Sequence, residues 1–342
     1  MPLLAFLHKA ASGASLSKEE AFAAMESILS GESSPPLIAA FLVALRTRGE
    51  NATELAGFAA ALRQHAIPVP LAPADRPLLD TCGTGGDGAQ TFNISTVAAF
   101  VAAGAGVHVA KHGNRSVSSR CGSADVLEQL GIPLLHSPEV AARAIEQVGI
   151  AFLFAPSFHP AVRHAMPVRK ELRMRTVFNL LGPLVNPANA SCQLVGAPGE
   201  SEARMMATAL SEMGAGRSYI VHGSDGLDEV TTTGPTLILE AENGEIREWQ
   251  FHPDMLGIPL ANSSDLLGGD AGENAAITIE ILSGAPGPKR DIVLVNSAFA
   301  ISAAHPELPL TATLAMAAES VDQGKALGRL NALRDFMQAA EG

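Results

Sequence analysis

The hydrophobic positions of the first 67 residues repeat at helical spacing and predict three helices. The first places Phe22, Met25 and Leu29 on one face, and the other two carry similar apolar stripes. Three helix-start signals precede these stripes: a Ser17–Glu20 capping box, the Pro35–Pro36 pair and an Asn51–Glu54 capping box. We therefore expect a small helical domain over residues 1–70, with a further helical contribution from about residues 160–182.

A proline-rich linker at 67–77 separates this region from a chain of different character, in which short apolar runs alternate with helical segments. The pattern predicts an α/β domain over residues 71–342 with a mainly parallel central sheet, whose later strands could also be antiparallel. Helices are expected at 97–105, 202–213 and 310–340. Strands are expected at Leu78–Asp80, Val107–Ala110, Ile150–Phe154, Cys192–Gly196, Tyr219–Val221, Thr236–Ala241, Ile277–Ile281 and, less regularly, Ile246–Phe251.

The composition of the chain limits the kinds of molecule that it is expected to bind. The chain has 35 acidic and 23 basic residues and a net charge of −12, so we expect no nucleic-acid partner and no membrane partner. The three cysteines lack paired spacing, which favours reduced thiols and a cytoplasmic location over a disulfide framework or a zinc site. The first residues lack the positively charged start of a signal peptide.

One window departs from this acidic background. From Gly88 to Ala124 there is no Asp or Glu, and the charged residues are Lys111, Arg115 and Arg120. A glycine-rich loop at 83–88 precedes the window, and Asn-Ile-Ser-Thr at 93–96 opens a predicted helix within it. Free N–H groups at a glycine loop and a helix start, together with local positive charge, predict a site for a phosphate-rich ligand.

The glycine loop matches the dinucleotide pattern G-x-G-x-x-G, but that pattern needs an acidic residue about 20 positions later to hold the ribose. The window contains none, so we reject a dinucleotide site. The glycine loop could still be a turn without a ligand, Ser95 or Thr96 could simply cap the helix, and the polar segment from Lys111 to Ser119 could be a solvated loop.

Two charged segments complete the candidate chemistry. Asp225-Gly-Leu-Asp-Glu229 is either a solvated turn or a source of hard oxygen ligands for Mg²⁺ beside substrate phosphates. The basic run from Arg169 to Arg175 is either a solvated helix face or the place where one arginine binds a substrate carboxylate. We expect His159 and His164 to be structural rather than catalytic.

Taken in order, the motifs GTGGD, NIST, KHGNR-VSS-CGSADVLE, PVRKEL-RT-FNLLGPL-NPA and DGLDE resemble the anthranilate phosphoribosyltransferase family of tryptophan biosynthesis. The resemblance runs from about residue 15 to beyond residue 330. It implies an N-terminal helical domain joined to a larger α/β domain, a homodimer, and Mg²⁺-dependent transfer of a phosphoribosyl group from phosphoribosyl pyrophosphate to anthranilate.

The resemblance also assigns expected roles to single residues. Ser95, Asp228 and Glu229 match the Mg²⁺ positions, and Gly83, Asn114 and Arg169 match the anthranilate contacts. No residue is assigned with certainty to catalysis, although His112 is a candidate proton acceptor. The expected phosphoribosyl pyrophosphate contacts are Gly83, Gly86, Asp87, Thr91, Asn93, Ser95, Thr96, Lys111, Ser119 and Ser123.

Two other functions stay open on the sequence alone. A pyrimidine nucleoside phosphorylase shares the related fold and a Lys/Ser phosphate site, and a nucleic-acid-binding paralogue without enzymatic activity could use the same scaffold. The Asp228–Glu229 pair and the Lys111–Asn114 segment favour the transferase over the phosphorylase. The net charge of −12 disfavours the nucleic-acid-binding paralogue.

Overall fold

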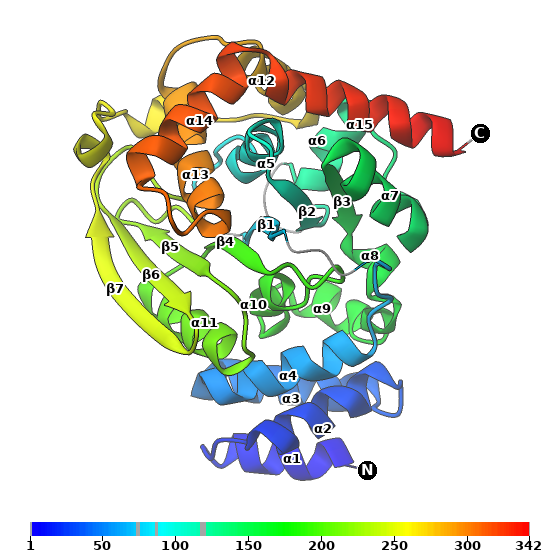
Figure 1. Ribbon diagram of the computed structural model, residues 1–342. Helices are drawn as coiled ribbons and strands as arrows, with labels where there is room; N and C mark the ends of the chain where they lie inside the picture. The colour runs from blue at the N-terminus through cyan, green and yellow to red at the C-terminus, as the bar shows by residue number, and fades with distance from the viewer. Residues whose placement is uncertain (1, 73–75, 86–87, 117–120, 342) are drawn as a thin grey trace.

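A seven-stranded sheet forms the centre of the protein (Figure 1). The computed structural model describes residues 2–72, 76–85, 88–116 and 121–341. The strand order is β3-β2-β1-β4-β5-β6-β7; the first five strands in this order pair in parallel, and β6 and β7 are antiparallel to their neighbours. The strands are β1 Leu78–Gly83, β2 His108–Gly113, β3 Ile150–Phe154, β4 Cys192–Gly196, β5 Ser218–Gly223, β6 Thr236–Glu242 and β7 Glu245–Phe251.

The helices form an N-terminal bundle and two layers against the sheet (Figure 1). The bundle consists of α1 Pro2–Ala11, α2 Lys18–Leu29, α3 Pro35–Arg48 and α4 Ala52–Gln64. The other α-helices are α5 Ile94–Gly104, α6 Ser123–Gln129, α7 Pro138–Val148, α8 Ala155–Phe158, α9 Met166–Leu172, α10 Phe178–Leu181, α11 Glu200–Glu212, α12 Ala271–Leu282, α13 Pro288–Ala304, α14 Leu310–Asp322 and α15 Lys325–Glu341. Short 3₁₀ helices are η1 Pro160–His164, η2 Gly182–Leu184, η3 Pro253–Leu256 and η4 Ser263–Leu266.

The N-terminal bundle follows its sequence signals, with one addition. Both predicted capping boxes are present at the starts of α2 and α4. The prediction of three helices was wrong, because α1 precedes them and packs against α2 and α3. This helix has ten residues and begins at a proline with no polar capping residue before it, so it lacks the start signal that marks the other helices of the bundle.

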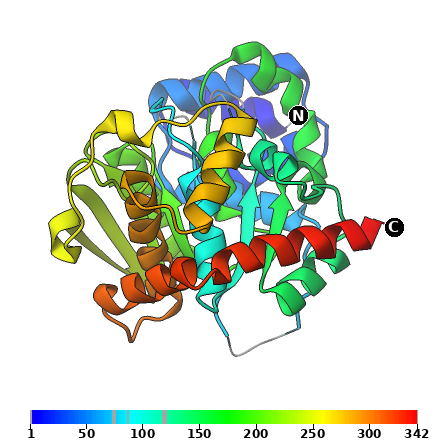
Figure 2. The same ribbon diagram turned by 90° about the horizontal axis from the view of Figure 1, so that it is seen from above.

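Successive side chains along a strand point to opposite faces of the sheet and are buried in two different hydrophobic cores. Leu194 and Tyr219 face a core shared with α5, α13 and α15, and Figure 2 shows α15 crossing this side of the molecule. Val195 and Ile220 face the opposite core, which includes α11 and continues without interruption into the N-terminal bundle. This period of two explains why the strands read as continuous apolar runs, since both faces are buried.

Two predicted elements were wrong. The run Ile277–Ile281 is β-branched and was expected to be a strand, but it lies in α12, which an Asp270–Glu273 capping box begins. The expected single helix over 310–340 is two helices, separated at Gly324, whose φ of +69° suits glycine. None of the described helices is both long enough and apolar enough to cross a bilayer.

The topology indicates where a ligand binds. The chain proceeds from β1 to β2 and β3 on one side, and returns later to place β4 on the other side of β1. The residues Gly83 and Gly196 end these two strands and pair with each other. In open α/β sheets the crevice outside such a reversal point is the usual ligand site.

Candidate active site

A cleft of about 310 Å³ opens at the carboxyl ends of β1 and β2. Its walls come from these strand ends, the start of α5, helices α9 and α10, and the loop after β5. Three expected contacts, Gly86, Asp87 and Ser119, lie outside the described residues. The predicted site residues that line the cleft are Gly83, Thr91, Asn93, Ser95, Thr96, Lys111, His112, Asn114, Ser123, Arg169, Asp228 and Glu229.

The turn that carries Asp228 packs directly against the ends of strands β1 and β4. A Cβ atom at Gly83 would lie 2.5 Å from Asp228 Oδ2, and one at Gly196 would overlap the Asp228 carbonyl oxygen. Gly85 donates its backbone N–H to the same Asp228 Oδ2 at 2.8 Å. Glycine at the two strand ends is therefore required for the close approach of a carboxylate that lies far away in the sequence.

The first turn of α5 contacts Glu229. Asn93 is the residue before the helix, and its side chain makes no capping bond, so neither Ser95 nor Thr96 is the N-cap. The expected free N–H groups are already paired: Ile94 and Thr96 donate to backbone carbonyls, and Ser95 donates to Glu229 Oε1 at 3.1 Å. Glu229 thus occupies the helix-start position that was expected for an anion.

Lys111 is the cation at the floor of the cleft, with 4% of its surface exposed. Its ammonium group donates to the Thr81 carbonyl oxygen and, at 3.3 Å, to Ser95 Oγ. Burial lowers the pKa of Lys111, and the nearby Asp80 carboxylate opposes that shift. The lysine is therefore fixed next to the hydroxyl that was predicted to bind both phosphate and metal.

Asp80 is a buried charged residue that the sequence analysis did not single out. It accepts hydrogen bonds from the His112 backbone N–H at 3.0 Å and from Asn186 Nδ2 at 2.8 Å. Burial raises the pKa of Asp80, whereas His112, Asn186 and Lys111 oppose the shift. The available signal was an aspartate in the apolar run Leu-Leu-Asp, since charged residues are seldom fully buried unless they are paired.

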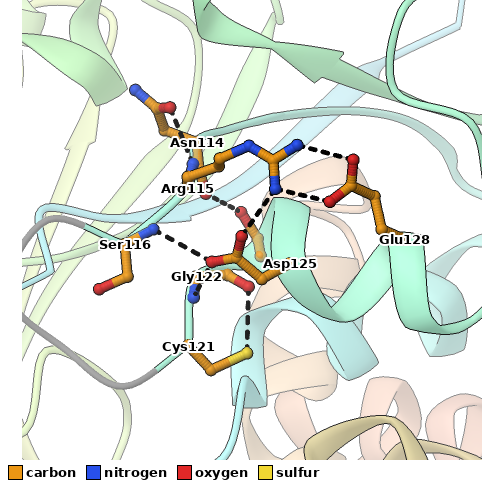
Figure 3. Close-up of polar contacts among 8 residues, drawn as sticks. Asn114, Arg115, Ser116, Cys121, Gly122, Asp125 and Glu128 are labelled. Atoms are coloured by element: carbon orange, nitrogen blue, oxygen red, sulfur yellow. Dashed lines mark hydrogen bonds and ion pairs between the residues drawn. The ribbon is translucent and has the colours of Figure 1, made fainter. Parts of the chain in front are cut away.

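The cationic character of the acid-free window is smaller than its sequence predicts. Arg115 forms ion pairs with Asp125 at 2.9 Å and with Glu128 at 2.5 Å, both on α6 just after the window ends (Figure 3). Arg120 lies outside the described residues. Lys111 and Arg115 both line the cleft, but the charge of Arg115 is already paired with these two carboxylates.

Arg169 on α9 also lines the cleft. Its guanidinium group lies over the Phe178 ring, 5.1 Å from the centroid, and it forms no ion pair with any described carboxylate. Burial lowers its pKa. A partly buried guanidinium stacked on an aromatic ring and lacking an anionic partner among the described residues is suited to bind the carboxylate of a ligand in a bidentate manner.

Two histidine rings pack together at the cleft, where His112 is a lining residue. The rings of His112 and His159 have centroids 5.1 Å apart, and burial lowers the pKa of both. His112 Nδ1 lies 3.0 Å from the Gly182 carbonyl oxygen, which can only accept, so Nδ1 carries the hydrogen. The neutral ring then leaves Nε2 as an acceptor, and this atom has no hydrogen-bond partner among the described residues.

The oxygen atoms of Ser95, Asp228 and Glu229 are of the type that Mg²⁺ prefers. Within the described part of the chain, no three His, Cys, Asp or Glu side chains converge as a metal site. A metal held here would therefore take few protein ligands and complete its coordination with phosphate or water oxygens, as Mg²⁺ usually does. Ser95, Asp228 and Glu229 therefore fit a Mg²⁺ ion that is also bound by a ligand phosphate.

Comparisons with known proteins agree with this geometry. The family model "Glycosyl transferase family, a/b domain" matches residues 75–327, and "Glycosyl transferase family, helical bundle domain" matches residues 4–66. Anthranilate phosphoribosyltransferase from Solibacter usitatus is 53% identical over 336 residues, which cover 98% of this chain and 99% of that protein. The enzyme of the same name from Moorella thermoacetica is 54% identical over 337 residues, again 98% and 99%.

Solved structures give the same result. Anthranilate phosphoribosyltransferase from Thermus thermophilus superimposes with a TM-score of 0.91 at 43% identity, covering 97% of this chain and 99% of that one. The Saccharomyces cerevisiae enzyme in complex with PRPP and Mg has a TM-score of 0.91 at 30% identity, covering 98% of each chain. Its complex with 4-fluoroanthranilate has a TM-score of 0.88 at the same identity and coverage. The chain belongs to the anthranilate phosphoribosyltransferases, within the glycosyl transferase family.

Proposed function

We propose that this cleft binds phosphoribosyl pyrophosphate with Mg²⁺ and anthranilate, and that the chain transfers the phosphoribosyl group to the anthranilate nitrogen with release of pyrophosphate. One observation supports this most strongly: a single cleft is lined both by the Asp228–Glu229 pair and by Arg169, which has no anionic partner among the described residues. The carboxylate pair suits a metal-bound diphosphate, and the arginine suits the carboxylate of an aromatic acid.

The phosphoribosyl pyrophosphate contacts are proposed to be the ten residues that the family resemblance assigned. The described members of that set all line the cleft, which supports the assignment. In the reaction the bond between ribose C1 and the pyrophosphate oxygen breaks, and positive charge develops on the sugar. Mg²⁺, held by Ser95, Asp228 and Glu229, would neutralise charge on the departing pyrophosphate. Lys111, which is buried at the cleft, would add a fixed positive charge.

Anthranilate is proposed to lie between Arg169, Asn114 and Gly83, with its carboxylate on the guanidinium group. This placement would direct the aromatic amine toward ribose C1, and positioning alone can contribute about 7–11 kcal/mol to lowering a barrier. The aromatic amine is neutral at pH 7, so a strong base is unnecessary. The free Nε2 lone pair of His112 is suited to accept the proton that the amine loses as the new C–N bond forms.

We further propose a homodimer, a cytoplasmic location and a domain boundary near residue 70, with residues 160–182 joining the helical domain. Three buried cysteines without paired spacing in the sequence suit a reducing compartment. The packing of α9 on α3 and of η1 on α2 supports the domain division. Sedimentation velocity tests the dimer.

Loss of anthranilate fluorescence in the presence of phosphoribosyl pyrophosphate tests the function directly. We expect turnover that requires Mg²⁺ and falls at least 100-fold in the double variant Asp228→Asn, Glu229→Gln. The control variant Asp254→Asn, Glu280→Gln changes two exposed acids outside the cleft and should behave as wild type. Turnover independent of Mg²⁺ would reject the metal assignment, and phosphorolysis of thymidine without anthranilate turnover would support a nucleoside phosphorylase instead.

A further inference from the structure

The loop that carries Asp228 and Glu229 runs from residue 224 to residue 235, between β5 and β6, and contains no helix or strand. Metal affinity depends on holding two carboxylates in a fixed geometry, and a long irregular loop does not do this by itself. Besides the hydrogen bonds that Asp228 and Glu229 accept from Gly85 and Ser95, two further sets of hydrogen bonds hold this segment, and neither of these involves a residue that lines the cleft.

The first set comes from Asn296, on helix α13, whose side chain is fully buried. Its Oδ1 accepts the Val230 backbone N–H at 2.9 Å, and its Nδ2 donates to the Val230 carbonyl oxygen at 2.9 Å. Nδ2 also donates to the Ile292 carbonyl oxygen at 2.8 Å, within its own helix. One amide side chain therefore satisfies both backbone groups of the residue that directly follows Glu229.

Helix α13 links the Asn296–Val230 contact to the proposed metal site. Helix α13 packs along α5, and the first turn of α5 carries Ser95. The Ser95 backbone N–H donates to Glu229 Oε1, so the two proposed ligands are already in register with each other. Asn296 thus ties the acidic segment to the same pair of helices that positions the hydroxyl ligand.

The second set lies within the loop. Asp225 Oδ2 accepts hydrogen bonds from Thr231 Oγ1 at 2.6 Å and from Thr233 Oγ1 at 2.5 Å, while its Oδ1 accepts the Leu227 N–H at 3.2 Å. These bonds join the two ends of the acidic segment. The neighbouring hydroxyl, on fully buried Thr232, has no hydrogen-bond partner among the described residues.

We propose that Asn296, assisted by the Asp225–Thr231 hydrogen bond, is a positioning residue that holds Asp228 and Glu229 in the geometry needed to bind Mg²⁺ with phosphoribosyl pyrophosphate. This inference rests on the proposed function of the cleft. Loss of the Asn296 amide leaves two buried backbone groups of Val230 without partners, so the loop shifts to solvate them and the carboxylates move with it.

The test measures binding rather than turnover. Isothermal titration gives the affinity of each variant for phosphoribosyl pyrophosphate with and without saturating Mg²⁺, in the absence of anthranilate. The ratio of the two dissociation constants is the gain in affinity that the metal provides. For Asn296→Ala we expect this gain to fall about tenfold, which corresponds to about 1.4 kcal/mol. The affinity without metal should stay close to that of wild type.

Two matched controls separate positioning from general destabilisation. Ser297→Ala removes a buried side-chain hydrogen bond from the same helix, where the hydroxyl donates to the Val293 carbonyl oxygen at 2.7 Å. Thr231→Val removes the hydrogen bonds of this hydroxyl to Asp225 and Thr233 without changing side-chain shape, whereas Thr232→Val removes a hydroxyl that bonds to no described residue. We expect Thr231→Val to reduce the metal-dependent gain severalfold, and both Ser297→Ala and Thr232→Val to retain it.

The outcomes are distinct. If wild type shows no metal-dependent gain, the proposed function of the cleft is wrong. If wild type shows the gain and Asn296→Ala retains it in full, the positioning role is rejected. If Asn296→Ala does not fold, Thr231→Val decides, since valine fills the same buried space as threonine: a gain equal to that of Thr232→Val overturns the proposal.

Discussion

Replacing Gly83 with alanine tests the contact between the first strand and the acidic turn. The φ angle of Gly83 is not positive, so alanine can adopt the same backbone conformation. Its methyl group, however, would lie 2.5 Å from Asp228 Oδ2 and 3.2 Å from Cγ. Close carbon–oxygen contacts are about 3.3 Å, so the carboxylate must move by about 0.8 Å. A misplacement near 1 Å at a reacting centre costs on the order of 100-fold in rate.

We therefore expect Gly83→Ala to lower kcat/KM for phosphoribosyl pyrophosphate on the order of 100-fold, equivalent to about 2.7 kcal/mol. Gly83 is exposed at a strand end, so the free energy of unfolding should change by no more than about 1 kcal/mol. The assay is anthranilate fluorescence at several Mg²⁺ concentrations. Gly328→Ala is the control, because a Cβ there meets nothing within 4 Å. Wild-type kinetics and Mg²⁺ dependence in Gly83→Ala would refute the reasoning.

Two further changes probe the aromatic side of the cleft and its buried histidines. Arg169→Gln should raise the KM for anthranilate about 10- to 100-fold, the worth of a charge-assisted hydrogen bond, and leave the KM for phosphoribosyl pyrophosphate nearly unchanged. Lys170→Gln, one position further on an exposed surface, is its control, and equal effects on both KM values would remove Arg169 from the anthranilate pocket. His159 has a pKa of about 3, lowered by burial and then by His112, so between pH 6.5 and pH 3 the unfolded chain binds a proton that the folded chain excludes. Stability from this group is present above pH 6.5 and is lost as the pH falls, so His159→Gln should reduce the loss of unfolding free energy between pH 6.5 and pH 5 by up to about 2 kcal/mol in urea titrations. An unchanged loss would show that His159 is protonated in the folded state.

The sequence predicted most of the fold, because the two periods of hydrophobic residues are strong where both faces of an element are buried. The prediction failed at Ile277–Ile281, where two local signals conflict, and at α1, where a local signal is missing. At Ile277–Ile281 the β-branched run favours a strand, but the capping box at Asp270 begins a helix that buries one side of the run. At α1 no local signal exists, and the helix forms because Leu3 is buried within the bundle.

The motifs predicted residues that line one cleft, but they did not predict how those residues pair with other parts of the chain. The window around Lys111 and Arg115 reads as strongly basic because linear sequence hides that α6 turns Asp125 and Glu128 back onto Arg115 (Figure 3). Likewise, nothing near Asn296 in the sequence indicates that its amide holds the residue after Glu229. Such contacts arise only when the chain is folded, since they join segments on different elements.

We propose that Asp228 and Glu229 hold a metal-bound diphosphate against the end of β1. A crystal structure of the protein soaked with phosphoribosyl pyrophosphate and Mg²⁺ tests it most directly. We expect metal density bridging at least one of these carboxylates to the pyrophosphate, with the ammonium group of Lys111 within reach of a phosphate oxygen. Phosphoribosyl pyrophosphate bound elsewhere, or bound in the cleft with no metal at either carboxylate, would contradict the claim.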